Sequence, residues 1–424
     1  MAFPAATPPK VTQVDPDEGP LDIMLPLRSA GSLENPYPIY DLLRTVRPAL
    51  PIPMPENAGS SAWLLTRYDD VHLVLSDRRF SADRMNSPLI RNNLDRLPDF
   101  LRQSAEGRRN LLTLDPPDHT RIRKLVNKAF TPKRIEALRG HIESITENLL
   151  DDLKSNRSFD LIHEVAEPLP AVVIAELLGV PARDHRQFRN WSSALIQALG
   201  SPDAKHRKAA TEAGQHLFAY LSKIIEERRK EPRDDLISAM LEAQEEKDAL
   251  TDLELLATSN LLLIAGHETT THLIGNGVLN LLREPSAWER LCREPQMMNS
   301  AVEELLRFDG PVQATLRVAR EDVEISEKVI PKGALVVASI GAANRDPAIF
   351  EDPGWLCLDR HPNPHLGFGF STHFCLGAPL ARLETEVVLR ALTQRFPHLS
   401  LADENPKYRE NPILRGLTKL ELNP

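Results

Sequence analysis

The segment from Leu263 to His272, LIAGHETTTH, places several polar side chains inside an otherwise apolar stretch. It is close to the HExxH pattern of zinc hydrolases, in which two histidines on one helical face bind the metal and the glutamate acts as general base. Here His267 and His272 are five residues apart, so on a helix they point about 140° away from each other. A zinc hydrolase is therefore the weaker alternative, and the polar patch needs another explanation.

Cys375 lies in HLGFGFSTHFCLGAPLARLE, a loop rich in glycine and aromatic residues that leads into a predicted helix. Backbone N–H groups and the positive end of that helix favour a thiolate over a thiol. A single thiolate in an apolar loop suits axial ligation of haem iron, although a buried cysteine can also act as a small hydrophobic residue. The other cysteines, Cys292 and Cys357, are too scattered for a disulfide framework or a cysteine-rich zinc site.

The elements that must position these two segments are mainly helices. Thr251 and Glu254 form a capping box at the start of the longest predicted helix, which runs to about Arg283 and ends before Glu284 and Pro285. At 1.5 Å per residue it spans roughly 50 Å, enough to cross a whole domain. Its apolar residues face nearly all directions, as expected of a central buried helix, and the polar patch lies in its middle.

The rest of the chain also alternates between helical and extended patterns. Further helices are predicted at about 35–44, 131–149, 169–178, 183–199, 206–230, 234–245, 286–294, 297–308 and 379–396. Extended segments are predicted at 51–54 and 63–66 around a hairpin turn at 56–59, within 314–340, and near 399–401 and 413–421. We predict a fold that is mainly α with a small β region, consisting of an N-terminal arm over 1–34 and one large domain over 35–424.

The composition argues against several classes of partner. Fifty-one basic and sixty acidic residues give a net charge of −9, and no Lys/Arg-dense stretch is interleaved with aromatic residues. Nucleic-acid binding is therefore not predicted. The opening MAFPAATPPKVTQVDPDEGP lacks the regions of an export signal, and no run of about 18 apolar residues occurs. We expect a cytoplasmic protein with no membrane anchor.

Five motifs occur along the chain, including the two segments above, namely DPPDHTRIR (115–123), AGHETT (265–270), EELLR (303–307), FEDPGWLCLDR (350–360) and FGFSTHFCLG (368–377). In this order they resemble the cytochrome P450 family of haem-thiolate monooxygenases, specifically its soluble bacterial branch. The resemblance covers essentially the whole chain beyond the arm and implies the cytochrome P450 fold. One residue departs from the pattern, because Ser371 stands where the family usually has glycine, and serine tolerates a positive φ less well.

The resemblance implies haem b as cofactor, with Cys375 as the ligand of the iron. Four residues are thereby expected to hold the haem propionates through charge-assisted bonds, namely His119, Arg123, Arg317 and His373. Phe368 is expected to pack beside the sulfur, and Ala265 and Gly377 to contact the cofactor. Glu304 and Arg307 would join Arg360 in a trio that fixes the loop of Cys375.

The polar patch in the long helix then has an explanation. Gly266 lowers the local helix propensity by about 1 kcal/mol, and the hydroxyl of Thr269 can bond to the carbonyl of Ala265, which opens a groove for dioxygen. By the resemblance, Glu268 and Thr269 supply protons for oxygen reduction. Packing roles alone, with Glu268 in a buried ion pair, are the alternative for this patch. His267 and His272 are predicted to pack or to lie at the surface.

The predicted activity is insertion of one atom of dioxygen into a small apolar organic substrate, such as a macrolide or terpenoid. A haem-binding sensor or carrier without turnover is the alternative from another class. By analogy with the family, the substrate pocket is expected to be lined by the loop 81–113, the helix pair joined near 200–206, Val312 to Thr315, and Ile413 with Leu414.

Electrons are expected from separate proteins, because no dinucleotide fingerprint or flavin domain is visible. We expect a monomer that receives them from a ferredoxin, which a ferredoxin reductase serves in turn. Arg121, Lys124 and Lys128 are a predicted docking face for an acidic ferredoxin. A solvated helix face explains the same three residues equally well.

Overall fold

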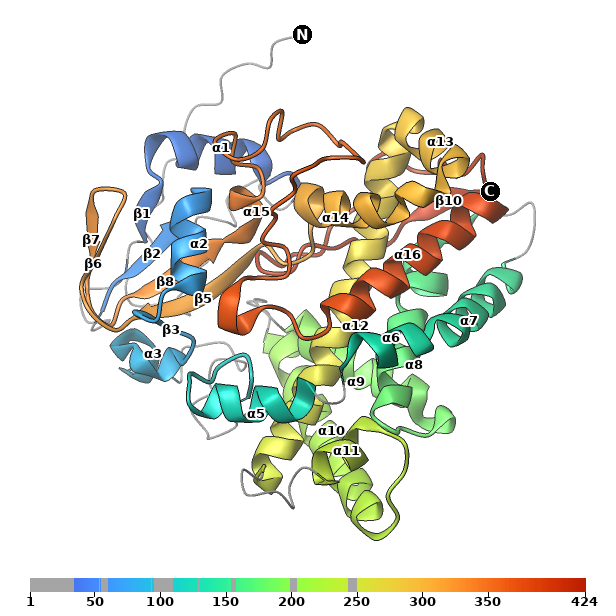
Figure 1. The fold of residues 1–424 in the computed structure, drawn as a ribbon, viewed down its shortest axis with the longest axis horizontal. Helices are drawn as coiled ribbons and strands as arrows, with labels where there is room; N and C mark the ends of the chain where they lie inside the picture. Colours follow the sequence, from blue (N-terminus) through green and yellow to red (C-terminus); the bar gives the residue numbers. More distant parts are fainter. Residues whose placement is uncertain are drawn as a thin grey trace.

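A computed structural model describes residues 34–52, 54, 60–92, 94, 110–127, 130–153, 158–198, 204–242 and 250–424. The long helix α12 (Asp252–Arg283) runs through the middle of the molecule (Figure 1). Its start is the predicted capping box, in which the Thr251 hydroxyl accepts from the N–H of Glu254 and the Glu254 carboxylate accepts from the N–H of Thr251. The segment that carries the polar patch is thus held at the centre of the fold.

Helices surround α12 on most sides and share one large apolar core with it. One group packs against the first half of α12: α8 (Pro168–Leu177), α9 (His185–Gln197), α10 (Ala204–Lys230) and α11 (Leu236–Glu242). A second group packs along its second half: α13 (Pro285–Arg293), α14 (Met298–Asp309) and α16 (Ala378–Arg395). Three more helices are α5 (Asp118–Asn127), which meets the start of α12, and α6 (Pro132–Ala137) and α7 (Arg139–Asp151), which pack against α16.

The β region lies to one side of the helices (Figure 1). Its main sheet has the order β1-β2-β8-β5-β3, in which only β2 and β8 are parallel. The strands are β1 (Ala49–Ile52), β2 (Ala62–Leu65), β3 (Phe80–Ser81), β5 (Ala314–Ala319) and β8 (Leu335–Ser339). Three short helices lie against or beside this sheet, namely α1 (Tyr37–Val46), α2 (Tyr68–Ser76) and α15 (Ile340–Ala343).

Smaller elements complete the fold. A second sheet has the order β4-β10-β9, and β6 and β7 form a hairpin. These strands are β4 (Phe159–Asp160), β6 (Val323–Ile325), β7 (Lys328–Ile330), β9 (Ser400–Leu401) and β10 (Glu421–Asn423). The short helices are η3 (Arg84–Asn86), α3 (Pro88–Asn92), η5 (Ile162–Ala166), η6 (Ala182–Asp184), η8 (Pro295–Met297) and η9 (Ser371–His373).

The prediction of a mainly α fold with a long central helix is confirmed, with local differences. The single helix predicted over 131–149 is wrong, because the chain forms α6 and α7 with a break at Leu138. Most of 413–421 is not strand: Leu414 and Leu417 form isolated bridges, and only Glu421 belongs to a strand, β10. The predicted hairpin turn at 56–59 and residues 1–33 of the predicted arm lie outside the described residues.

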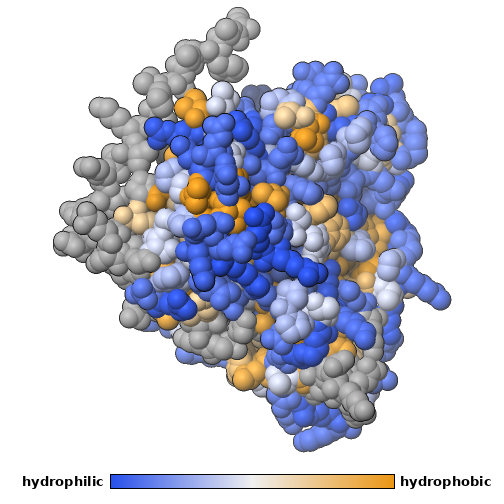
Figure 2. All heavy atoms as spheres, turned by 60° about the vertical axis from the view of Figure 1, so that its left-hand side comes forward, coloured by the Kyte–Doolittle hydropathy of each residue, from blue (hydrophilic) through white to orange (hydrophobic). Residues whose placement is uncertain are grey.

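Among the described residues, no helix is long and apolar enough to cross a membrane. The face of the molecule on the side of the β region is largely hydrophilic, with scattered apolar side chains (Figure 2).

Candidate active site

The loop before α16 holds Cys375 in a fixed place. The N–H of Cys375 donates to the carbonyl of Phe368 at 2.8 Å, and the Cys375 side chain is half-buried. Gly377 is the N-cap of α16, and a Cβ built on it would meet no atom within 4 Å. The sulfur therefore lies at the start of a helix, beside space that a cofactor can enter.

The ionisation of Cys375 differs from the prediction. Burial raises the pKa of the thiol, and this outweighs the backbone N–H groups of Gly377 and Ala378 and the charges of Arg123 and Arg382, which lower it. The prediction that the loop by itself favours the thiolate is therefore wrong in its net effect. Coordination to a metal ion deprotonates a thiol outright, so the ligand role does not depend on this balance.

Ser371, which stands where the family usually has glycine, has a backbone conformation in the left-handed region. Its φ is +57° and that of Gly369 is +71°. The turn before the cysteine thus keeps the backbone conformation that glycine adopts without cost, and the serine is strained there by about 1–2 kcal/mol.

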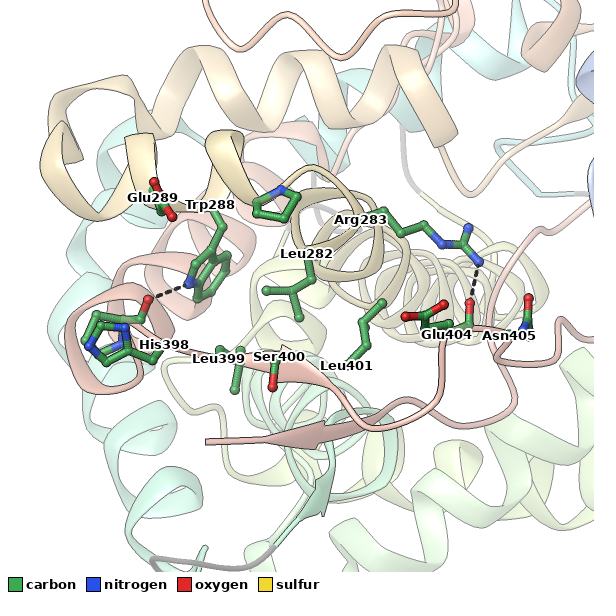
Figure 3. Close-up of a pocket in the computed structure, with 12 residues that line it drawn as sticks. Leu282, Arg283, Trp288, Glu289, His398, Leu399, Ser400, Leu401, Glu404 and Asn405 are labelled. Atoms are coloured by element: carbon green, nitrogen blue, oxygen red, sulfur yellow. Dashed lines mark hydrogen bonds between the residues drawn. The ribbon is translucent and has the colours of Figure 1, made fainter. Parts of the chain in front are cut away.

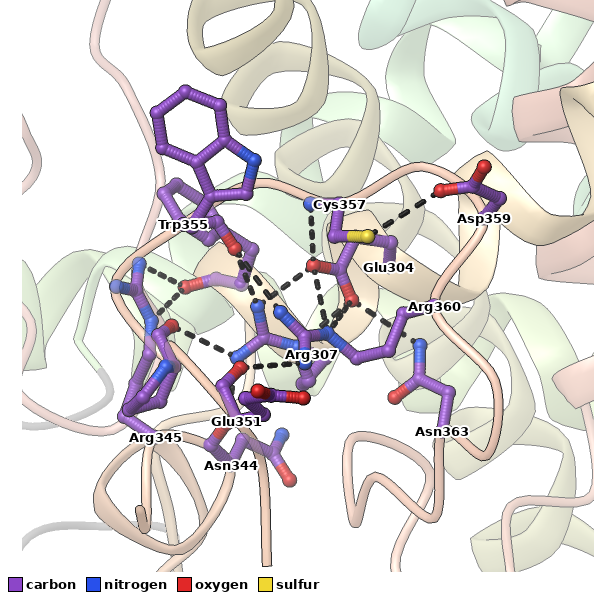
Figure 4. A network of polar contacts seen from close by, with 12 residues as sticks. Glu304, Arg307, Asn344, Arg345, Glu351, Trp355, Cys357, Asp359, Arg360 and Asn363 are labelled. Carbon is purple, nitrogen blue, oxygen red and sulfur yellow. Dashed lines mark hydrogen bonds and ion pairs between the residues drawn. The ribbon is translucent and has the colours of Figure 1, made fainter.

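A buried polar network holds the irregular stretch that precedes the cysteine loop (Figure 4). The Glu304 carboxylate accepts from Arg307 at 2.7 and 2.8 Å and from Arg360 at 3.2 Å, and the side chains of Glu304 and Arg307 are both 0% exposed. Arg307 also donates to three backbone carbonyls of the irregular stretch, those of Asn344, Pro353 and Trp355. The predicted trio is thus present, and it fixes residues 344–360 against α14.

The polar patch of α12 forms the predicted side-chain bond, within a helix that is continuous from Asp252 to Arg283. The Thr269 hydroxyl donates to the carbonyl of Ala265 at 2.7 Å. Ala265 is exposed although it lies in the middle of a central helix, so its side chain faces open space rather than another element. Glu268, one residue before Thr269, is instead fully buried, and burial raises the pKa of its carboxyl group to about 7. The two predicted proton donors therefore have different surroundings.

Basic and imidazole side chains gather near the cysteine loop. The rings of His119 and His373 lie 4.3 Å apart, and neither nitrogen of the buried His119 ring has a hydrogen-bond partner among the described residues. Burial lowers the pKa of His119 to about 4 and that of His373 to about 3, with the charge of Arg317 adding to both effects. Arg123 donates to Asn127 at 3.1 Å, and its charge acts on Cys375.

Arg317 is a buried positive charge of this cluster. It is 5% exposed, donates to the carbonyl of Leu316 at 2.9 Å, and burial lowers its pKa to about 10. Arg84, which the sequence analysis did not single out, is also buried, and the charge of Arg317 helps lower its pKa to about 10. The nearby carboxylate of Asp115 is bonded to Ser81 and Arg320, so this cluster is set up to receive a further anion.

Comparison with known proteins agrees with this geometry. The family model described as Cytochrome P450 matches residues 51–423. The chain belongs to the cytochrome P450 family.

Relatives in that family match over nearly their full length. The cytochrome P450 monooxygenase PikC of Streptomyces venezuelae is 40% identical, over 92% of this chain and 91% of PikC. The solved structure of the cytochrome P450 PksS of the Bacillus subtilis bacillaene polyketide synthase has a TM-score of 0.83 and 40% identity, over 92% of this chain and 97% of PksS. The tirandamycin C-bound P450 monooxygenase TamI has a TM-score of 0.82 and 38% identity, over 92% of this chain and 97% of TamI.

A P450 binds haem, and the residues present fit that group. An iron porphyrin needs a thiolate ligand, room beside it and donors for two propionates. The chain has Cys375 beside an open position at Gly377, and a cluster around the buried Arg317 guanidinium in which both ring nitrogens of the neutral His119 are unpaired among the described residues. Two unpaired nitrogens of this kind are costly unless a partner binds there.

The predicted substrate segments are only partly described. Val312 pairs with Leu414 in an isolated bridge, and the N–H of Gln313 donates to the carbonyl of Ile413 at 2.8 Å, so these two segments do lie side by side. Residues 93, 95–109 and 199–203 of the other two predicted segments lie outside the described residues.

The predicted docking face for a ferredoxin is changed by the structure. Arg121 forms an ion pair with Glu254 at the start of α12, so the Glu254 carboxylate largely neutralises its charge. Lys124 is exposed, and Lys128 lies outside the described residues.

A surface pocket at the far end of α12 takes no part in this site. It is lined by residues of α12, α13 and the segment 397–405, among them Leu282, Trp288 and Leu401 (Figure 3). The indole N–H of Trp288 donates to the carbonyl of Pro397 at 3.2 Å, and Arg283 donates to the carbonyl of Glu404 at 3.1 Å. None of the predicted site residues lines it.

Proposed function

We propose that this P450 monooxygenase inserts one atom of dioxygen into a small apolar secondary metabolite of the macrolide or terpenoid type, with haem b held through Cys375. The observation that carries the cofactor assignment is the buried guanidinium of Arg317 beside the neutral rings of His373 and His119, the latter with both ring nitrogens unpaired among the described residues. A buried charge is costly unless an anion neutralises it, and an unpaired buried imidazole is costly unless a partner bonds to it. Two propionates supply that neutralisation, while the iron supplies the oxygen chemistry when haem is bound.

The chain's own residues would each do a separate part of the work. His119, Arg123, Arg317 and His373 would hold the propionates of the haem, and Phe368 would shield the sulfur from water. The Thr269 hydroxyl lies beside the exposed Ala265 in the middle of the central helix, where it would act on dioxygen. A carboxyl group with a pKa of about 7 both releases and regains a proton readily at neutral pH. Glu268 is therefore suited to supply protons toward Thr269.

Support for the substrate class comes from relatives. PksS is named for a polyketide synthase and TamI is bound to tirandamycin C. The predicted walls at Val312 to Thr315 and at Ile413 with Leu414 are adjacent. For the electron supply we infer a separate ferredoxin and ferredoxin reductase, and for the protein itself a cytoplasmic monomer.

The decisive experiment is the carbon monoxide spectrum of the reduced, haem-loaded protein. Wild-type protein is expected to give the red-shifted band of thiolate ligation, and Cys375→His is expected to lose it. Cys357→Ser is the matched control, because Cys357 is also half-buried but lies by Asp359 in the irregular stretch, and it should keep the band. Wild-type protein that binds haem without this band would refute the proposed ligand.

A sensor or carrier would share this spectrum, so a second measurement separates the two functions. A monooxygenase consumes reduced nicotinamide and oxygen when a ferredoxin and its reductase are supplied, and it forms one hydroxylated product per oxygen when a substrate from a macrolide and terpenoid panel binds. A haem protein with the thiolate band but no oxygen consumption above the level without protein would support the sensor instead.

A further inference from the structure

The surroundings of Glu268 contain more unpaired polar atoms than packing explains. Neither carboxylate oxygen of Glu268 has a hydrogen-bond partner among the described residues, and the same holds for Nε2 of His267 and Nδ1 of His272. All three side chains are at most 1% exposed. Interaction with the Ser193 side chain lowers the pKa of Glu268, against the larger effect of burial. Buried polar groups of this kind are normally satisfied by a protein partner or an internal water.

His272 lies against Glu268, and neither His272 nor His267 adds charge to this cluster. Nε2 of His272 lies 3.4 Å from Oε2 of Glu268, and Nδ1 of His267 lies 3.2 Å from the Ser192 hydroxyl. Burial lowers the pKa of His272 to about 3 and that of His267 to about 4. Both rings are therefore neutral at physiological pH, and each still offers one donor and one acceptor.

From this cluster, polar side chains lead to the surface on the side of the C-terminal segment. Arg409 and Glu167 form an ion pair at 2.9 Å, with their side chains 18% and 13% exposed. Their charges act on the pKa of Glu268, Arg409 lowering it and Glu167 raising it. Exposure thus rises from 0% at Glu268 to 1% at His272 and then to this partly exposed pair.

The same segment fixes the His272 ring. The N–H of Arg409 donates to the carbonyl of Gly416 at 2.8 Å, and a Cβ built on Gly416 would lie 2.0 Å from Nδ1 of His272. Only glycine allows the ring to lie this close to the backbone, so His272 is held between Glu268 and the segment that carries Arg409.

We propose that Glu268 receives its protons from solvent along this path, which enters at the Glu167–Arg409 pair and passes His272. His272 is a positioning residue: its neutral ring holds the Glu268 carboxyl group and an internal water beside it. In each transfer Glu268 releases its carboxyl proton toward Thr269 and regains one from that water, which is reprotonated from solvent at Glu167, so no charge accumulates on the ring. The inference rests on the proposed function, because it supplies the protons for Glu268 and Thr269.

The test uses haem-loaded protein with NADPH, a plant-type ferredoxin and its reductase, in H₂O and in D₂O. His272→Phe removes both ring nitrogens, and we expect the fraction of oxygen released as hydrogen peroxide to rise several-fold. The rate of oxygen reduction to water should fall about tenfold, less than the full effect of a general acid because Glu268 remains. The solvent isotope effect on that rate should increase.

Two further variants separate the proton path from packing. His272→Asn keeps a donor and an acceptor and should restore the peroxide fraction to within about twofold of wild type. Thr271→Val is the matched control, because Thr271 is buried on the same helix and bonds to the carbonyls of Ala166 and His267 instead. It should leave the peroxide fraction and the isotope effect unchanged.

The possible failures are distinguishable. Wild-type protein without the thiolate carbon monoxide band would overturn the proposed function itself. In a second outcome, every variant keeps the normal carbon monoxide band while His272→Phe shows the peroxide fraction and isotope effect of the wild type. That result would overturn only the proton path. Should His272→Phe fail to fold, Arg409→Gln tests the entrance, and an unchanged isotope effect in that variant counts against the path.

Discussion

The Glu304 network gives the sharpest prediction about stability. In Glu304→Gln the side chain keeps its shape but loses its charge, so the fully buried Arg307 no longer has a counterion. The new amide N–H₂ would also face donors, since the carboxylate accepts from Arg307, from Arg360 at 3.2 Å and from the N–H of Cys357 at 2.9 Å.

The magnitude follows from these contacts. Removing one partner of a buried ion pair costs about 3–5 kcal/mol, because the other charge remains buried and unpaired. We expect a loss of this size, which is a large part of the roughly 5–15 kcal/mol that stabilises an ordinary domain. Haem should also dissociate faster, because Arg307 holds the carbonyls of Asn344, Pro353 and Trp355 in the stretch before the cysteine loop.

The assay is urea unfolding of the haem-loaded protein, followed by circular dichroism and by haem absorption. Glu294→Gln is the control, because Glu294 pairs with Arg290 at 3.5 Å on the surface and should lose no more than about 0.5 kcal/mol. If the two variants differ by less than about 1 kcal/mol, the interpretation of the network as a buried, charge-dependent support is refuted.

Three further predictions concern single positions. Ser371→Gly should raise the unfolding midpoint by the equivalent of up to about 1 kcal/mol, because glycine relieves the positive φ of +57°; a lower midpoint would contradict this. Glu384→Gln should change the pH dependence of stability, because burial raises the pKa of Glu384 to about 8. Between the pKa of Glu384 in the unfolded chain and about pH 8, the folded wild type binds one proton more than the unfolded chain. Its free energy of unfolding therefore falls by about 1.4 kcal/mol for each unit of rising pH from this group, and that of the variant does not. Parallel curves of unfolding free energy against pH would refute this prediction. Thr269→Ala should retain haem and the thiolate band but release more hydrogen peroxide per NADPH, and an unchanged peroxide yield would count against the role of its hydroxyl.

Local patterns in the chain were enough to predict several features. The Thr251 cap, the bond from Thr269 to Ala265 and the strained turn at Ser371 all involve residues within a few positions of one another. Their geometry is set by the repeat of a helix or the form of a turn, and these depend on neighbouring residues. The family motifs added the order and the expected roles of the longer-range residues.

Other features depend on residues far apart in the sequence. The net pKa of Cys375 depends on how completely the surrounding elements bury it, and Arg84 became part of the site only through its neighbour Arg317. The break at Leu138 between α6 and α7 is a further case, since apolar spacing alone continues through it.

The sequence by itself determined the helical character, the central helix with its polar patch and the single cysteine in a glycine-rich loop, because these follow from residue type and spacing. The tertiary structure decided the surroundings of each side chain. It placed Thr269 beside open space and enclosed Glu268 with His272, and it brought Glu167 and Arg409 to the same region. The physical reason is that burial and long-range charge, which set the chemistry of a titratable group, are produced only when distant segments pack together.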